Sequence, residues 1–198
     1  MKRALLLICS LMVMQNAQAG LLGNFFFLEP YVGYKTENTQ LTNLVNMKTD
    51  IKTTTPALGL KLGIRSPIGV DVAVYGEYVT GLATITGLSD KNKFHKNSSG
   101  AQLSVNSLGF VKMYIGTTFT NEFIVEESNQ IGETTLKGSC YNVGLLFKIL
   151  PIANFGVQYN LNQYSEISGP TYTNGNKIDT YYSKVDNQDY MFYLSSMF

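Results

Sequence analysis

The residues best suited to chemistry in this sequence are few and scattered. The single histidine, His95, lies three positions before Ser98, and a histidine that acts with a serine and a carboxylate is the arrangement of a nucleophilic hydrolase. In a polar stretch that resembles a loop, however, a solvated histidine is the more common role. The adjacent carboxylates Glu126 and Glu127 fit an acid–base pair or calcium ligands, but a charged strand end has such residues more often. The sequence therefore predicts no catalytic residues.

Metals, cofactors and nucleic acid are also not expected. The chain has two cysteines and one histidine, too few for a structural zinc site. It has no HExxH, GxSxG or glycine-rich phosphate motif. Cys140 is interpreted as an inert buried thiol, and a position at the rim, where it could pair with another molecule, stays open as the alternative. Fifteen basic residues balance 14 acidic ones, so the chain lacks the cationic surface that nucleic-acid binding requires.

The first 19 residues predict a secretory signal peptide. Lys2 and Arg3 precede the apolar run 4–14, and Ala17-Gln18-Ala19 forms a small-x-small cleavage site. The run is too short for a membrane-spanning helix, which needs about 20 apolar residues. We therefore expect residues 1–19 to be removed and residues 20–198 to form the mature domain.

The rest of the chain alternates apolar and polar residues with the period of a β-strand. The clearest segment is 57–65, in which the residues of one face are Leu58, Leu60, Leu62 and Ile64. Such alternation indicates strands rather than helices. The other segments with this period are 26–35, 70–77, 108–116, 122–128, 141–149, 155–162 and 189–198.

The connections between these segments alternate in length. The short ones are 66–69, 117–121 and 151–154, and the long ones are 36–50, 82–103, 129–136 and 165–188. Barrels of the bacterial outer membrane have short periplasmic turns and longer extracellular loops, and only a closed barrel can cross a bilayer with strands. The pattern predicts an all-β fold, an eight-stranded antiparallel up-and-down transmembrane β-barrel, with both termini in the periplasm.

The last predicted strand carries a family resemblance. Tyr190, Phe192, Leu194 and Phe198 stand at even offsets and end the chain on an aromatic residue. Together with the signal peptide and the strand pattern of 25–198, this resembles the small outer-membrane β-barrels of the OmpA transmembrane-domain, OmpX and OmpW types, without selecting one of them. The resemblance implies that these four residues are the assembly signal for the barrel-insertion machinery. It also implies a monomer surrounded by outer-membrane lipid and lipopolysaccharide.

A lipocalin is an exported eight-stranded barrel too, but its apolar face points inward. In this chain the less apolar face carries glycines and charges of both signs, as a narrow lumen would, and the other face would be a large exposed apolar patch on a soluble protein. We therefore assign the polar face to the lumen. The charged residues predicted to form a lumenal ion-pair network are Lys61, Arg65, Asp71, Glu77, Lys112 and Lys148.

Counting from the 66–69 turn places Arg65 opposite or diagonal to Asp71. The same count places Lys61 near Glu77. A lumen filled in this way predicts a plugged barrel rather than an open pore.

Two classes of function remain open. The first is a non-enzymatic envelope barrel with a structural or surface-binding role and long extracellular loops. The second, suggested by the OmpW resemblance, is a narrow channel or a carrier for small apolar molecules. A lipid-modifying enzyme that uses His95 is a third, less favoured interpretation.

Overall fold

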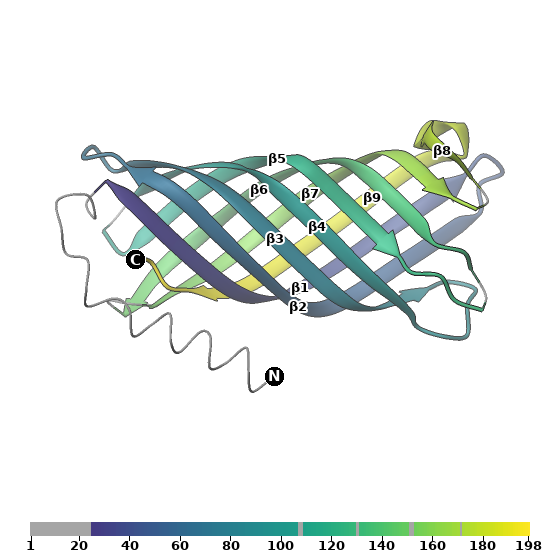
Figure 1. The fold of residues 1–198 in the computed structure, drawn as a ribbon, viewed down its shortest axis with the longest axis horizontal. Helices are drawn as coiled ribbons and strands as arrows, with labels where there is room; N and C mark the ends of the chain where they lie inside the picture. Colours follow the sequence, from purple (N-terminus) through teal and green to yellow (C-terminus); the bar gives the residue numbers. More distant parts are fainter. Residues whose placement is uncertain (1–24, 107–108, 130, 151–152, 171) are drawn as a thin grey trace.

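The computed structural model describes residues 25–106, 109–129, 131–150, 153–170 and 172–198. The predicted signal peptide lies outside these ranges. In the described part, long antiparallel strands form one barrel (Figure 1). Its strands are β1 (Phe26–Asn43), β2 (Lys48–Arg65), β3 (Val70–Ile85), β4 (Asn92–Asn106), β5 (Val111–Val125), β6 (Thr134–Leu150), β7 (Ala153–Gly169) and β9 (Tyr182–Ser195). No helix among the described residues has the length and apolar character needed to cross a membrane.

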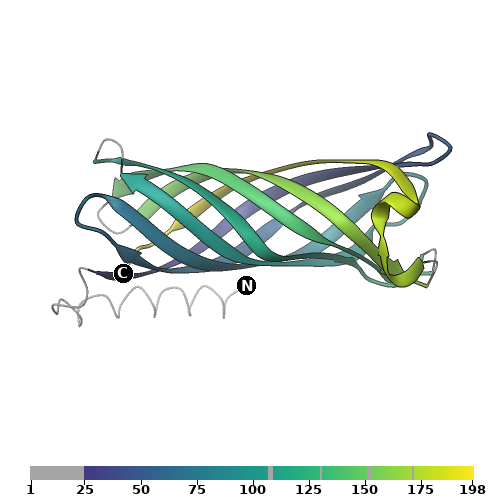
Figure 2. The same ribbon diagram turned by 90° about the horizontal axis from the view of Figure 1, so that it is seen from above.

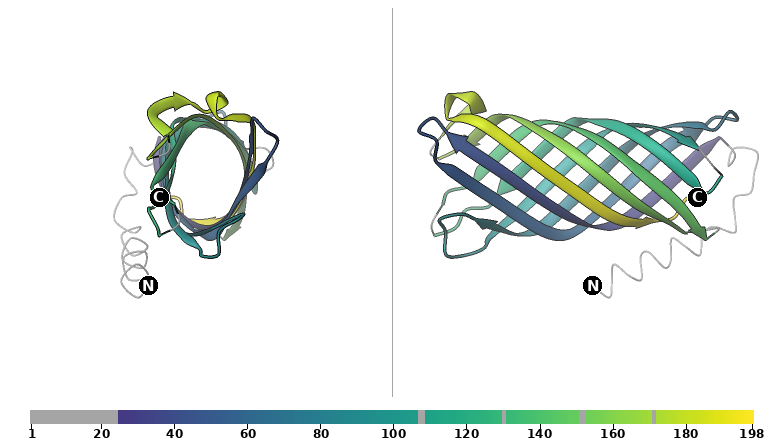
Figure 3. Two further views of the ribbon diagram at one scale, coloured as in Figure 1. Left: turned by 90° about the vertical axis from the view of Figure 1, so that its right-hand side faces the viewer. Right: turned by 180° about the vertical axis from the view of Figure 1, so that it is seen from behind.

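The barrel is closed by backbone pairing all the way around. Each strand from β1 to β7 pairs with the next, and β9 pairs with both β7 and β1. The view along the axis in Figure 3 shows the complete ring. The short strand β8 (Tyr172–Lys177) pairs with β7 at one end and is followed by the 3-10 turn η3 (Ile178–Thr180). The eight-stranded antiparallel barrel predicted from the sequence is therefore confirmed.

Two strand assignments made from the sequence were wrong, but the predicted number of strands was right because one strand was missed and another was counted twice. Most of β4 lies in the segment 82–103 that was predicted to be a loop, and the segments 108–116 and 122–128 both fall largely on the single strand β5. The predicted turn 117–121 lies inside β5, at a bulge where Phe119 is the extra residue opposite β4. A bulge shifts the side-chain alternation by one position, so it looks like the end of one strand and the start of another.

The two ends of the barrel differ. The turn end carries the turn 66–69, where Gly69 adopts a positive φ of 82°, and the chain terminates there as well. The opposite, loop end carries the connections 44–47, 86–91, 126–133 and 170–181, the last of which contains β8 and η3 (Figure 2). The long loops predicted from the sequence are therefore shorter than expected, because the strands extend well beyond the segments that alternate clearly.

The polarity of the wall reverses along the barrel. In the half near the turn end, apolar side chains point outward and are exposed. This apolar belt includes Val32, Leu60, Val74, Leu103, Ile115, Val143, Leu161 and Phe192. Near the loop end the outer surface is polar and the inner one is a packed apolar core. Its buried residues include Leu41, Ile51, Val79, Phe94, Phe123, Leu136 and Ile167.

Exposed aromatic side chains mark the loop-end border of the apolar belt. They are Tyr34, Tyr78, Tyr141 and Tyr190. Rings of aromatic residues at the borders of an apolar band are typical of barrels in a membrane, because their amphipathic side chains suit the head-group region. The belt is therefore the membrane-spanning part of the wall.

Candidate functional site: the interior of the barrel

The most unusual feature of the interior is the number of charged side chains that it buries. All of them belong to inward-facing positions of the strands, and each is less than a tenth exposed. They are Glu29, Lys35, Glu37, Lys61, Asp71, Glu77, Lys96, Lys112 and Asp189. A barrel of eight strands has an interior just wide enough for side chains to fill, so these groups meet across it.

Five of these residues, Lys35, Glu37, Glu77, Lys96 and Asp189, form a central network. Lys35 Nζ lies 2.6 Å from Glu77 Oε1 and 3.1 Å from Asp189 Oδ2. Lys96 Nζ lies 2.7 Å from Glu37 Oε2 and 3.3 Å from the same oxygen of Asp189. Asp189 thus joins two ion pairs into one network. Buried charges are tolerated only with partners of this kind, since an unpaired one is strongly destabilising.

Uncharged side chains complete the hydrogen bonding of the central network. The amide groups of Asn160 and Asn162 donate to the two oxygens of Asp189, at 3.0 and 3.1 Å. Tyr164 donates its hydroxyl hydrogen to Glu37 Oε1 at 2.8 Å, and Tyr31 donates to Glu77 Oε2 at 3.1 Å. These bonds hold each carboxylate in one orientation.

Nearer the turn end, Lys61 occupies a cage of tyrosines. Its Nζ lies 4.7 Å from the ring centre of Tyr114 and 4.9 Å from that of Tyr193, and it donates a 3.2 Å hydrogen bond to the Tyr193 hydroxyl. Tyr31 adds a third ring at 5.4 Å. The carboxylate nearest to Lys61 is Glu29, at 3.7 Å. Cation–π contacts and one long ion pair therefore stabilise this ammonium group.

The structure places the six predicted lumenal residues in two groups. Lys61, Asp71, Glu77 and Lys112 are buried, and Lys112 Nζ lies 2.5 Å from Asp71 Oδ2. Arg65 and Lys148 lie at the mouth of the turn end, where Arg65 is partly exposed and Lys148 exposed.

The predicted pairings need correction. Arg65 is opposite Asp71 in the β2–β3 ladder, as expected, but Asp71 forms its ion pair with Lys112. The ion-pair partner of Glu77 is Lys35 rather than Lys61. Cross-strand counting found neighbours on adjacent strands, whereas these partners lie on strands that are next but one in the ring and meet inside the lumen.

Sequence reasoning did not assign four members of the interior to the network. Lys35 and Asp189 have the right parity in segments that were predicted to be strands, so parity was a usable signal for both. Glu37 and Lys96 lie in segments that were predicted to be loops. Because these strand portions were not predicted, side-chain parity could not place Glu37 and Lys96 in the lumen.

Glycines of the lumenal face lie beneath aromatic rings from neighbouring strands. A Cβ atom on Gly59 would collide with the ring of Tyr31, and one on Gly156 with the ring of Tyr193. The tyrosines that surround Lys61 therefore have room only because the next strand carries no side chain there.

The candidate catalytic residues are not brought together. His95 belongs to β4 rather than to a loop, and its Nδ1 lies 3.6 Å from Glu126 Oε1 on the outside of the barrel. Ser98 is buried on the opposite face of β4, where its hydroxyl bonds to Asn121 at 2.9 Å. Because residues three apart in a strand face opposite sides, these two side chains cannot act together. Cys140 is buried, and the described residues contain no cluster of three or more potential metal ligands from His, Cys, Asp and Glu.

The proposed assembly residues follow one line along the last strand. Tyr190, Phe192 and Leu194 of β9 are exposed on the apolar belt. Phe198 lies beyond the end of β9, but it continues the ladder, because its N–H donates to the Leu28 carbonyl at 2.9 Å and its carbonyl accepts from the Leu28 N–H at 3.1 Å. The chain end is thus fastened to β1.

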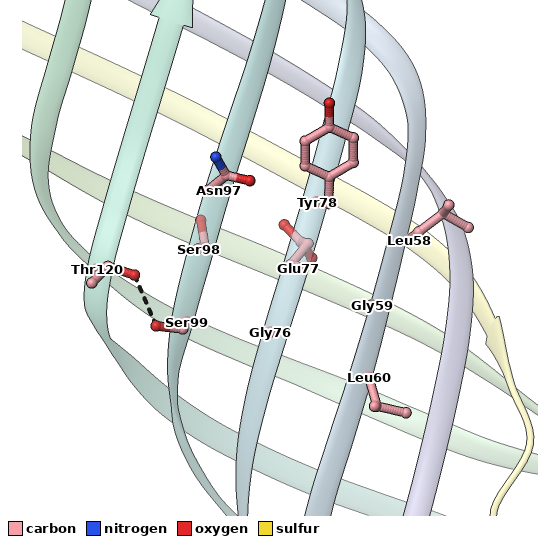
Figure 4. A pocket seen from close by; sticks show the side chains of 10 residues that line it. All are labelled: Leu58, Gly59, Leu60, Gly76, Glu77, Tyr78, Asn97, Ser98, Ser99 and Thr120. Atoms are coloured by element: carbon pink, nitrogen blue, oxygen red, sulfur yellow. Dashed lines mark hydrogen bonds between the residues drawn. The ribbon is translucent and has the colours of Figure 1, made fainter.

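The outer wall has a shallow hollow of about 420 Å³ in the apolar belt (Figure 4). It arises where Gly76 carries no side chain, between Leu60 on one side and Ser99 on the other. The hydroxyl groups of Ser99 and Thr120 hydrogen-bond to each other at 2.8 Å, which satisfies them away from water. Lipid chains can fill such a hollow without further partners.

Comparison with solved structures identifies the same architecture elsewhere. The attachment invasion locus protein Ail of Yersinia pestis, solved with the heparin analogue sucrose octasulfate, gives a TM-score of 0.58 at 13% sequence identity, covering 88% of this chain and 99% of Ail. The outer membrane protein OprG of Pseudomonas aeruginosa gives a TM-score of 0.52 at 15% identity, covering 89% of this chain and 97% of OprG. No family model and no curated protein sequence matches the chain. The chain therefore has the fold that Ail and OprG share, the small eight-stranded β-barrel of outer-membrane proteins.

Proposed function

We propose that this protein is a non-enzymatic integral barrel of the bacterial outer membrane, with a filled interior and a structural or surface-binding role. The observation that carries the proposal is the buried central network in a barrel whose outer face is apolar along the belt. In this arrangement the turn end and both termini face the periplasm, and the loop end faces outward. Lipid and lipopolysaccharide surround the belt, and the barrel-insertion machinery is the partner during assembly.

The filled interior supports a role that does not require transport through the lumen. An ion crossing the barrel would have to separate Lys35 or Lys96 from carboxylates at 2.6–2.7 Å. Beyond them it would meet the apolar core of the loop end, where Phe94 and Phe123 stack with ring centres 5.1 Å apart. Both layers oppose the passage of a hydrated ion.

The loop end supplies the surface for a binding role. Its outer wall carries cations on the β2 and β4 side at Lys52 and Lys93. The other side carries more acidic residues, of which Glu127 and Glu133 are exposed and form no ion pair within the described part of the chain. Opposite charge on two sides of one rim suits orientation beside charged head groups or a charged partner.

Two measurements test this proposal. Outer-membrane fractionation with heat-modifiable gel migration should show a closed barrel that resists SDS until it is boiled. In planar bilayers the wild-type protein should give no large, stable single-channel conductance, whereas Lys35→Ala/Glu77→Ala, which empties part of the central network, should increase the leak. A stable wild-type conductance would refute the filled lumen.

A second candidate function, carriage of small apolar molecules, is favoured by one specific feature. A largely apolar pocket of about 300 Å³ lies where β1 meets β9, and Pro30, Leu194 and Phe198 are among its lining residues. Pro30 has no N–H with which to bond to a neighbouring strand, so the wall is weaker there. Native mass spectrometry with decane or decanoate should show one bound molecule that Ala153→Phe, which fills the pocket, removes. Equal binding by that variant would exclude this site.

A further inference from the structure

A pocket of about 490 Å³ opens at the turn end of the barrel. We call it the turn-end pocket, and its polar lining includes Arg65, Asp71, Asn106, Lys112 and Lys148. Neither the proposed structural role nor the central network uses these groups. Its size is within the range of pockets that bind small ligands, and its position at the mouth makes it accessible.

The charges of the turn-end pocket favour an anion. Lys112 and Asp71 neutralise each other at 2.5 Å. Arg65 and Lys148 remain, and neither forms an ion pair within the described part of the chain. Two unneutralised cations in one pocket are suited to a phosphate group, because guanidinium and ammonium groups both bind phosphate through charge-assisted hydrogen bonds.

The pocket also offers acceptors that an anion alone would leave without partners. Asp71 Oδ1 and Asn106 Oδ1 are both buried, and neither has a hydrogen-bond partner among the described residues. Buried polar atoms are nearly always hydrogen-bonded, so these oxygens call for a donor from a ligand or from water. A ligand that carries a phosphate and an N–H donor would satisfy the cations and the acceptors together.

The rim of the turn-end pocket is apolar. Ile149 and Leu150 line it, and their side chains are 60% and 58% exposed. Phe110 lies beside them, since its carbonyl accepts the Lys148 N–H at 2.8 Å, and it is 59% exposed. A polar pocket next to an exposed apolar rim fits an amphipathic molecule, with its head inside the mouth and its chains on the outer wall.

We propose that the turn-end pocket binds the head group of a phosphatidylethanolamine-type lipid. Arg65 and Lys148 hold the phosphate, Asp71 Oδ1 and Asn106 Oδ1 accept hydrogen bonds from the ammonium group, and the acyl chains lie against Ile149 and Leu150. The inference rests on the proposed membrane location, which puts this mouth at the periplasmic leaflet. Soluble phosphoethanolamine esters offer the same head-group chemistry, so the test must separate the two sources.

Binding is measured by native mass spectrometry of the refolded mature chain in a phosphate-free detergent. The probes are dihexanoyl phosphatidylethanolamine, dihexanoyl phosphatidylcholine and glycerophosphoethanolamine. We expect the choline lipid to bind about tenfold more weakly than the ethanolamine lipid, because its quaternary ammonium has no N–H to donate. We expect Arg65→Gln/Lys148→Gln to weaken ethanolamine-lipid binding by about tenfold or more, since it removes both phosphate contacts.

The matched control is Lys137→Gln, which removes a cation from the loop end and should leave lipid binding unchanged. Equal binding of the two lipids, together with no effect of the double variant, would overturn the proposal. Binding of glycerophosphoethanolamine as tight as that of the lipid would overturn the lipid source in favour of a soluble phosphate ester. Heat-modifiable migration shows separately whether each variant folds into a closed barrel. Loss of lipid binding by a folded barrel is therefore distinguishable from failure of the proposed membrane location.

Discussion

Lys35 Nζ lies 2.6 Å from Glu77 Oε1, although strand β2 separates the strands that carry them. The pair therefore passes over the inner face of β2 and joins two strands that are next but one in the ring. Contacts of this kind tie strands together that share no backbone hydrogen bonds. The side chains of the interior thus cross-link strands in addition to the backbone hydrogen bonds, and their removal should lower the stability of the whole barrel.

Replacement of Glu77 by alanine should strongly destabilise the barrel. It leaves the buried Lys35 with Asp189 as its remaining carboxylate partner, at 3.1 Å, and removes the acceptor of Tyr31. We expect the free energy of unfolding to fall by about 3–5 kcal/mol, the usual cost of breaking a buried pair on one side. Urea titration of the protein refolded in vesicles measures it.

The control for this change is the exposed pair Lys137–Glu122, whose Nζ–Oε1 distance is 2.9 Å. Glu122→Gln should cost less than about 1 kcal/mol, because solvent screens an exposed pair. Equal losses in the two variants would contradict the structural role given to the central network.

Two glycines on opposite faces of the wall should respond differently to alanine. Gly59→Ala forces a Cβ into the ring of Tyr31 and should cost about 1–3 kcal/mol through overpacking. Gly76→Ala should have little effect, because nothing lies within 4 Å of the added atom. The midpoints of thermal unfolding of the two variants, compared on heat-modifiable gels, give the result. A Gly76 variant that is the less stable of the two would disprove the assignment of the faces.

A charge placed on the apolar belt should be costly. Leu60 is exposed on this belt, so Leu60→Arg should lower the unfolding free energy by about 2–4 kcal/mol if the site lies near the middle of the bilayer. Thr54→Arg, on the same face of β2 but nearer the loop end, is the matched control and should be tolerated. Refolding yields into vesicles compare the two, and equal yields would show that the belt does not contact lipid.

Phe198→Asp should prevent assembly in the cell. The resemblance to small outer-membrane barrels gives the terminal aromatic residue the role of an insertion signal, and the structure shows its backbone bonded to Leu28. We expect the variant to remain in the periplasm and to be degraded, as measured by immunoblotting of envelope fractions. The conservative Phe198→Tyr should assemble normally, and outer-membrane levels of the Asp variant equal to wild type would refute the role.

The sequence was informative where lipid imposes a simple rule. In the apolar belt the outward residues must be apolar, so 57–65 and 141–149 showed their parity and were placed correctly. Nearer the loop end that rule ends, and the outer wall becomes polar while the inside becomes apolar. In β4 the outward positions of that half include Lys93, His95 and Asn97, so no apolar face marked the strand and it was read as a loop.

The ion pairs were less predictable than the faces. Parity along a strand determines whether Lys61 or Glu77 points inward, and those two are buried as expected. It does not determine which inward group each one meets, because that depends on the curvature of the closed ring. Partners on strands that are distant in the ring, such as Lys96 and Asp189, follow only from the three-dimensional structure.

The reversal of polarity along the wall fixes the depth at which the barrel sits in the bilayer. If the barrel moved so that its loop end entered the bilayer, Lys52 and Lys93 would enter hydrocarbon. If it moved the other way, Leu60 and Val74 would meet water. Both displacements are unfavourable, so the bilayer holds the barrel at one depth. The distance between the loop-end rim and the membrane is therefore encoded in the strands themselves, and any partner of this rim meets it at that fixed distance.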